Sequence, residues 1–173
     1  LGPLEMTVFW LGMMPKASIE ESKYLYLAMT SKWVRYDLLE GMVVKETRYP
    51  LAVADLAFRS ATFNPPNQLL IGLNDGSIIT YDVWNGTVLS KSNQKAHTAA
   101  ITALQVDCFT STLVSLSDDR TLKLWPADNA VAPLRSLDFN SFHFGYLQPL
   151  SLALSGGFVF VGLRDKEILM FSL

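Results

Sequence analysis

This chain has few of the residues on which metal binding and covalent cross-linking depend. Its 173 residues include one cysteine, Cys108, and two histidines, His97 and His143. One cysteine excludes an internal disulfide, and its place after an apolar strand favours a buried or turn thiol over a reactive one. The two histidines and the cysteine match no zinc-ligand spacing. We therefore expect no metal, no cofactor and an intracellular location in a reducing compartment.

Long hydrophobic runs and an excess of one charge are lacking as well. No continuous apolar stretch reaches the ~18 residues of a membrane helix, so membrane insertion is not expected. Fourteen basic and sixteen acidic residues give a net charge of -2, which leaves no basic footprint for nucleic acid. Residues 1–6 lack the basic region and cleavage site of a signal peptide, and residues 1–5 are open to interpretation as a tag remnant.

A short pattern recurs along the chain at a nearly fixed interval. Its clearest copy, residues 116–125, has a strand end, a polar turn with Asp119, and a strand that closes on Trp125 six residues later. The other copies cover residues 28–36, 74–82 and 162–171, and the position of Asp119 is taken there by Thr30, Asp75 and Asp165. These positions are 45, 44 and 46 residues apart. Such a period, with several short strands per unit, is typical of propeller blades.

The turn at Asp119, the strand that ends at Trp125 and the upstream His97 resemble the WD-repeat β-propeller family. The typical blade of that family has a Gly-His pair, a strand with a serine, a turn with an aspartate and a strand that ends in Trp-Asp. This chain has Ala96-His97 and Trp125-Pro126 at those places. His97 precedes Asp119 by 22 residues, and His143 precedes Asp165 by the same number. The resemblance covers residues 7 to 172, and one blade matches it well.

The pattern predicts an all-β fold of about four blades, each of four antiparallel strands, in one partial propeller over residues 1–173. The blades are predicted at about 7–48, 49–92, 93–138 and 139–173. Alternation and turn residues place the strands at 7–14, 23–30, 32–37 and 42–46; 52–59, 68–73, 77–83 and 87–91; 100–106, 112–117, 121–126 and 131–137; and 147–154, 158–163 and 166–172. The last blade thus lacks its outer strand. Asn85-Gly86 is predicted to form a two-residue turn with both positions at positive φ.

Rings of this family usually hold seven or eight blades, so the resemblance implies the C-terminal half of a larger propeller. Another polypeptide, a cleaved fragment or a second copy would complete the ring. A self-closed ring of four blades is the remaining alternative.

The resemblance also implies a hydrogen-bonded network within the third blade. It would join His97, Asp119 and Trp125 to either Ser115 or Ser117, and the repeat places Asp75, His143 and Asp165 at corresponding positions. A hydrolase triad needs an exposed hydroxyl and an oxyanion hole beside it, whereas this serine would be committed to the indole within a sheet. We therefore interpret the set as structural and expect no enzymatic activity.

The remaining expectation is a surface for protein or peptide partners. In the family, the rim that carries the Asp turns often binds peptides, and the residues before each Asp are Asn74, Asp118 and Arg164. The aromatic loop with Phe142, Phe144 and Tyr146 is added because aromatics dominate interface hot spots. The sequence thus predicts a non-catalytic interaction platform in a larger intracellular assembly. Two alternatives stay open: a structural half-propeller that only completes a ring, and part of a propeller enzyme whose active site lies in other blades.

Overall fold

The computed structural model describes residues 8–12, 23–29, 32–48, 58–91, 95–128, 132–141 and 148–173, without the side chains of 8–12, 58 and 91. Within these ranges the chain forms four antiparallel sheets, each built from consecutive strands. The sheets are β1 (Val8–Gly12), β2 (Tyr24–Met29), β3 (Lys32–Asp37) and β4 (Met42–Arg48); β5 (Phe58–Asn64), β6 (Gln68–Leu73), β7 (Ile78–Asp82) and β8 (Val88–Lys91); β9 (Ile101–Asp107), β10 (Thr112–Ser117), β11 (Thr121–Pro126) and β12 (Arg135–Asp138); and β13 (Pro149–Ser155), β14 (Phe158–Leu163) and β15 (Ile168–Ser172). The predicted fold class is confirmed: these are propeller blades, and the last one has three strands.

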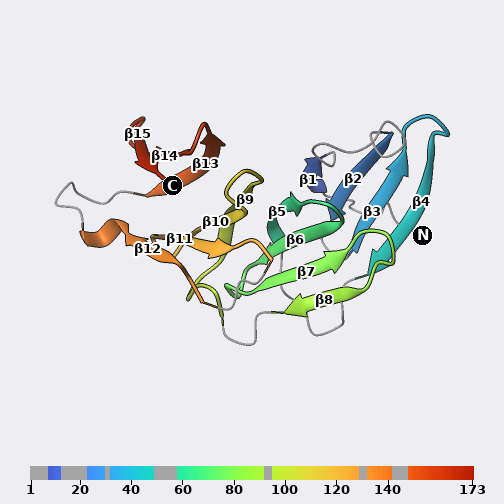
Figure 1. Cartoon of the computed structure of the whole chain (residues 1–173), viewed down its shortest axis with the longest axis horizontal. Coiled ribbons are helices and arrows are strands. Elements are labelled where there is room, and N and C mark those ends of the chain that lie inside the picture. Colours follow the sequence, from blue (N-terminus) through green and yellow to red (C-terminus); the bar gives the residue numbers. More distant parts are fainter. Residues whose placement is uncertain are drawn as a thin grey trace, which may run out of the picture.

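The four sheets follow one another in an arc. Strand β5 contacts β1 and β9, and β9 in turn contacts β13, so the first strands of successive sheets are neighbours. Figure 1 shows the arc running from β1–β4 through β5–β8 and β9–β12 to β13–β15. The same order appears in the packing, because each of the three apolar clusters is formed between two successive sheets.

Alternation of side chains across each strand explains this packing. On β6, Leu69 and Ile71 face the first sheet, whereas Leu70 faces the third. On β10, Leu113 faces the second sheet and Val114 the fourth. Such strands are buried on both faces, and each fully buried aliphatic or aromatic side chain contributes roughly 1.5 to 3 kcal/mol.

The repeat is visible in the backbone as well as in the sequence. The residue after each Asp position has positive φ: Gly76 at 84°, Arg120 at 63° and Lys166 at 67°. Gly41 and Gly86, 45 residues apart, have φ values of 66° and 72° between the third and fourth strands of their sheets. The blades therefore repeat a turn conformation even where the residue type changes.

Two strands differ most from their predicted ranges. The first strand of the second sheet was expected at 52–59, but β5 is Phe58–Asn64, because the turn at Pro65 and Pro66 leads directly from it into β6. β12 is Arg135–Asp138, shorter than the expected 131–137, and the 3-10 turn η1 (Phe139–Ser141) follows it. Leu122 and Lys123 pair with Leu137 and Ser136, which fixes the register of this outer strand.

The prediction of a two-residue turn at Asn85-Gly86 was wrong. The turn spans residues 83–87, and only Gly86 of that dipeptide has positive φ. The Asp82 carboxylate accepts hydrogen bonds from the backbone of Trp84 (2.8 Å) and Asn85 (2.9 Å) and so holds a wider loop. Asp37 caps the corresponding turn of the first sheet through the backbone of Leu39 (2.9 Å) and Glu40 (3.1 Å).

None of the helices in the described ranges is long and apolar enough to cross a membrane.

Candidate functional site

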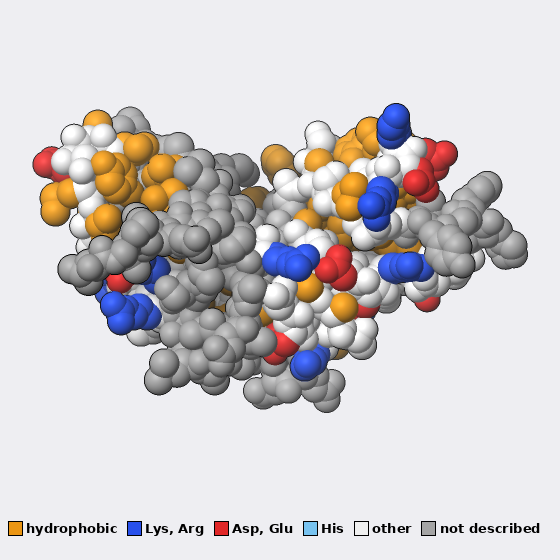
Figure 2. All heavy atoms as spheres, turned by 180° about the vertical axis from the view of Figure 1, so that it is seen from behind, with side chains coloured by type: hydrophobic (Ala, Val, Ile, Leu, Met, Phe, Trp, Pro, Cys, Tyr) orange, Lys and Arg blue, Asp and Glu red, His pale blue; other side chains and the backbone are white. Residues whose placement is uncertain are grey.

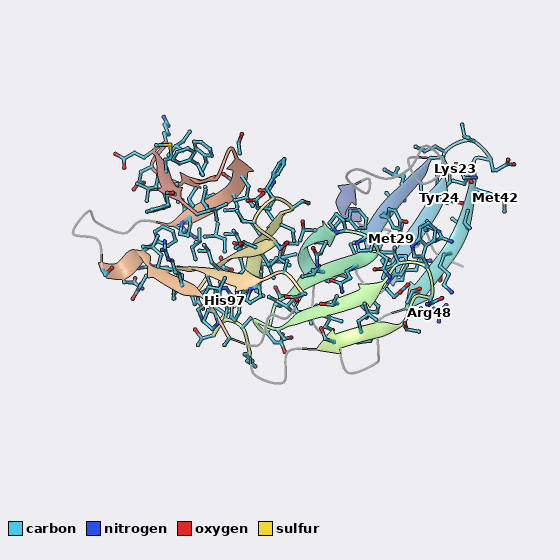
Figure 3. The ribbon with its side chains drawn as sticks, in the orientation of Figure 1. Lys23, Tyr24, Met29, Met42, Arg48 and His97 are labelled. Carbon is cyan, nitrogen blue, oxygen red and sulfur yellow. The ribbon has the colours of Figure 1, made fainter. Side chains whose placement is uncertain are left out.

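The third sheet brings His97, Ser115, Asp119 and Trp125 together. His97 Nδ1 lies 3.0 Å from Asp119 Oδ2, and His97 Nε2 lies 2.7 Å from Ser115 Oγ. Ser115 Oγ also accepts a hydrogen bond of 2.8 Å from Trp125 Nε1. Figure 3 labels His97 in this sheet.

One arrangement of protons satisfies the whole network. Since the indole N–H donates to Ser115, the serine hydroxyl is free to donate to His97 Nε2. His97 then donates its Nδ1–H to the Asp119 carboxylate. Thr121 Oγ1 donates to the other carboxylate oxygen at 2.7 Å, and the Thr98 backbone donates at 2.9 Å. The network is closed, with neutral His97 and ionised Asp119.

Burial and hydrogen bonding set the charges of this pair. Burial lowers the pKa of His97 and outweighs the attraction of Asp119, which acts in the opposite direction. Burial by itself would raise the pKa of Asp119, but the hydrogen bonds from Thr121 and Thr98 and the nearby His97 lower that pKa to about 2. The contact is therefore a hydrogen bond of a neutral imidazole at neutral pH.

The same geometry leaves the serine unsuited to attack a substrate. Ser115 is fully buried, as are His97 and Trp125, and its hydroxyl is bonded on two sides. A nucleophile needs an exposed oxygen and a cavity in front of it. Ser117, the other candidate, accepts a hydrogen bond of 3.1 Å from the Asp119 backbone and donates one of 3.2 Å to Ala99 O, so it is a turn residue.

At the corresponding positions of the other blades, the residues that the structure describes do not form this network. The Asp75 carboxylate accepts hydrogen bonds from the backbone and the hydroxyl of Ser77. Asp165 is exposed, and the described residues form no hydrogen bond to its side chain. His143 and Thr30 lie outside the described residues. No group of three or more potential metal ligands occurs among the residues that the structure describes.

The turns between the second and third strands form one edge of the arc, which we call the Asp rim (residues 74–77, 118–120 and 164–167). Asp118 forms an exposed ion pair with Arg59 of the preceding sheet, with Nη1 3.3 Å from Oδ2. It does not pair with Arg164, which instead donates a hydrogen bond of 2.8 Å to Gln148 Oε1. The Asn74 side chain is partly buried. The predicted loop with Phe142, Phe144 and Tyr146 lies outside the described residues.

The opposite edge, which we call the hairpin rim, consists of the other strand turns (residues 38–41, 83–87, 108–111 and 156–157). Unlike the Asp rim, it exposes large apolar side chains, namely Leu38, Leu39, Trp84 and Phe109. Phe109 is 88 % exposed. None of the four is among the binding candidates predicted from the sequence, because an apolar residue in a turn is not distinctive by itself.

A pocket of about 340 Å³ lies beside Phe109, between the β9–β10 and β13–β14 hairpins. Its walls include Val106, Cys108, Leu154 and Leu173, and Gln105 contributes a polar group. Gln105 Oε1 is buried and has no hydrogen-bond partner among the described residues. A buried acceptor without a donor is uncommon in native proteins.

A second cluster on the hairpin rim joins the first two sheets. The Arg35 guanidinium lies 4.9 Å from the ring centres of both Tyr24 and Trp84, and Arg35 Nη1 donates to Val83 O at 3.4 Å. Lys23 pairs with Asp37 at 3.0 Å beside the same Tyr24. Figure 3 shows Lys23 and Tyr24 at the end of the first sheet opposite Met29 and Arg48. Trp84 is 36 % exposed.

Comparisons with known proteins identify the fold. No family model and no curated protein sequence matches the chain. Among solved structures, the crystal structure of the computationally designed Ika4 protein is similar over 100% of this chain and 95% of that one, with a TM-score of 0.71 and 18% identity. The designed Ika8 protein is similar over 96% of this chain and 46% of that one (TM-score 0.70, 18% identity). A chain of the Mitotic Checkpoint Complex is similar over 91% of this chain and 44% of that one (TM-score 0.69, 14% identity). At these identities the comparisons show the propeller-like fold alone.

Proposed function

We propose that this chain is a non-catalytic platform of WD-repeat type that binds protein partners within a larger intracellular assembly. The observation that carries the proposal is the exposed Phe109 ring beside the pocket at the hairpin rim. An isolated apolar surface residue needs no explanation, but a fully exposed aromatic next to a preformed pocket has the composition of an interface hot spot.

The pocket indicates the kind of ligand. A volume of about 340 Å³ is at the lower limit for small-molecule sites and holds one or two side chains of a peptide. Val106 and Leu154 supply apolar contacts, and the unpaired Gln105 Oε1 can accept a hydrogen bond from a peptide N–H. We therefore expect a partner segment with one large apolar anchor and a backbone or side-chain donor close to it.

Two further observations support binding rather than catalysis. His97, Ser115 and Asp119 are the side chains that most resemble a catalytic triad. His97 and Ser115 are buried, and Ser115 Oγ accepts a hydrogen bond from the indole of Trp125. Asp118 and Arg164 on the Asp rim, and Arg59 paired with Asp118, are exposed charges that offer a second surface for a partner. Asn74 belongs to the same rim and stays a weaker candidate because it is partly buried.

The test is selection of binding peptides from a random display library on the immobilised chain, followed by calorimetry with the purified peptides. We expect Phe109→Ala to weaken binding by at least about 2 kcal/mol, the usual threshold for a hot spot. Gln105→Leu keeps the size of the side chain and removes the acceptor, so a smaller loss is expected. Because Phe109 is exposed, the measurement on Phe109→Ala should not be confounded by unfolding.

The matched control is Leu89→Ala, which removes another exposed apolar side chain, on β8 at the outer edge of the second sheet. Peptide affinity should not change in this variant. Equal affinity of every selected peptide for the wild-type chain and Phe109→Ala would overturn the hairpin rim as the binding surface.

A further inference from the structure

The last sheet, β13–β15, has an uncovered apolar face. Along β14 and β15, successive side chains point to opposite faces of the sheet. Val159, Val161 and Phe171 lie on the face that packs on the third sheet. The other face carries Phe158, Phe160, Ile168 and Met170. Ile168 is 71 % and Met170 59 % exposed. Figure 2 shows hydrophobic side chains at the surface of this sheet.

The same positions are covered in the other three blades. By register, Ile168 pairs with Gly162 as Ile78 pairs with Gly72 and Leu122 with Leu116. Ile78 and Leu122 are each only 2 % exposed, because the next sheet lies over them. Phe160 likewise corresponds to the buried Leu70 and Val114. The residue types are those of an interface between blades, and only the covering blade is missing from the described chain.

The second blade shows in detail what covers such a face. A Cβ on Gly72 would come within 2.7 Å of Ile101 Cγ2 and 2.6 Å of Ser60 Oγ, so Ile101 of the next sheet packs directly against the glycine. Ser60 Oγ also donates a hydrogen bond of 3.2 Å to Ile101 O. The last blade repeats the pair as Gly162 and Ser151, but there the added Cβ would meet Ser151 alone. The space beside Gly162 and Ser151, which we call the seat, can therefore hold an aliphatic residue at the start of a neighbouring blade's first strand.

We propose that the first sheet, β1–β4, of a second copy of this chain occupies that seat. Val8 begins β1 and pairs with Met29, as Ile101 begins β9 and pairs with Ser117, so the second copy presents an aliphatic residue at the required position. The face of the first sheet that does not contact the second is apolar as well: Leu25, Leu27, Met29, Val34 and Tyr36. Leu25, Leu27 and Tyr36 keep part of their side chains exposed, whereas Met29 and Val34 are already buried within the single chain.

A two-fold pair uses both ends of the arc at once. The last sheet of each copy contacts the first sheet of the other, so the arrangement is closed and leaves no uncovered apolar sheet face at either end. The lengths of the similar structures agree with it. An arc of this length makes up 95% of the Ika4 chain, and slightly under half of the Ika8 chain. The Ika4 chain is thus about as long as one such arc, and two arcs come close to the length of the Ika8 chain.

The first experiment measures the mass of the chain in solution by sedimentation and light scattering. The pair should have twice the 19.3 kDa of one chain. Met170→Asp places a charge in the proposed interface and should raise the dissociation constant at least about 100-fold, which yields single chains. The matched control is Leu134→Asp, since Leu134 is 61 % exposed but lies in the third blade. A single-chain mass for the wild type, or a pair that survives Met170→Asp, would overturn the proposal.

The second experiment identifies the contact itself. In a Cys108→Ser background, one copy carries Ser151→Cys and the other Val8→Cys, and a short bismaleimide joins cysteines that lie close together. A cross-link between the two different copies is expected, because their counterparts Ser60 and Ile101 are in contact. Replacing Ser151→Cys by Leu134→Cys should abolish it. Equal yields for both mixtures would contradict the proposed orientation, whether or not Phe109 binds peptides.

Discussion

Asp119 Oδ2 lies 3.0 Å from His97 Nδ1, although 22 residues separate the two in the sequence. The contact ties the segment that enters the third sheet to the turn between its second and third strands. Through Ser115 it also reaches Trp125, so one side chain network spans three strands or their ends. It is buried against the second sheet, where Leu70 and Ile78 pack beside Trp125.

The first prediction concerns the two aspartates at equivalent places, Asp119 and Asp165. Asp119→Ala removes the acceptor for His97, Thr98 and Thr121, and should lower the free energy of unfolding by about 2 to 3 kcal/mol. Asp165→Ala should change it by less than about 0.5 kcal/mol, since that side chain is exposed. Urea denaturation followed by tryptophan fluorescence measures both. Similar losses of unfolding free energy in the two variants would show that the hydrogen bonds of Asp119 do not stabilise the chain more than an exposed turn aspartate does.

The second prediction concerns pH. The pKa of His97 is lowered in the folded chain, so the unfolded chain binds a proton first as the pH falls below about 6.5. Stability is therefore fully present above that pH and declines below it. Asp119 adds to the pH dependence only in more acid solution: its folded pKa of about 2 lies below the ordinary 3.8, so its stabilising contribution is present above pH 3.8 and is lost as the pH falls toward 2. Unfolding free energies from pH 7.5 to 5 should fall more steeply for the wild type than for His97→Gln, which retains His143. Parallel curves would exclude a neutral, buried His97.

The third prediction compares two glycines with positive φ. Gly76 has a φ of 84°, and a Cβ there would come within 2.7 Å of the carbonyl carbon of His97 and 2.8 Å of Ala99 O. Gly76→Ala should therefore destabilise the chain by at least about 2 kcal/mol, from backbone strain together with separation of the second and third sheets. Gly156 has a φ of 58° and nothing within 4 Å of its added Cβ, so Gly156→Ala should cost about 1 kcal/mol. Thermal unfolding of both variants separates the contact from the conformation.

Much of the fold follows from local sequence. The period set by Asp75, Asp119 and Asp165 locates the turns, and the two strands on either side of the Asp119 turn, β10 and β11, were predicted residue for residue. Strands next to long connections were placed less well. The start of β5 depends on pairing with β6 across the Pro65-Pro66 turn, and alternation of residues 52–59 contains no information on that register.

The site was less accessible to sequence reasoning. Spacing relates His97 to Asp119, but both Ser115 and Ser117 alternate onto the same face, and only the distance to Trp125 distinguishes them. Phe109 carried no signal, since an apolar residue in a turn is ordinary by itself. Phe109 becomes a candidate for binding only because the β13–β14 hairpin of the next blade forms the other wall of the pocket beside it. Asp118 likewise pairs across blades with Arg59, a residue 59 positions away.

The last prediction decides between the two rims as the partner surface. Asp118→Lys reverses one charge of an exposed pair with Arg59, and such pairs typically contribute less than about 1 kcal/mol to stability. Arg164→Glu reverses an exposed charge at the next turn, where Arg164 bonds the neutral Gln148 side chain, so both variants should remain folded. If the hairpin rim binds, their peptide affinities at moderate salt should stay within about threefold of the wild type, because exposed charges beyond about 10 Å are screened. Phe109→Ala should lose most of the affinity under the same conditions. Loss of binding in the two charge variants, with Phe109→Ala unaffected, would instead assign the partner to the Asp rim.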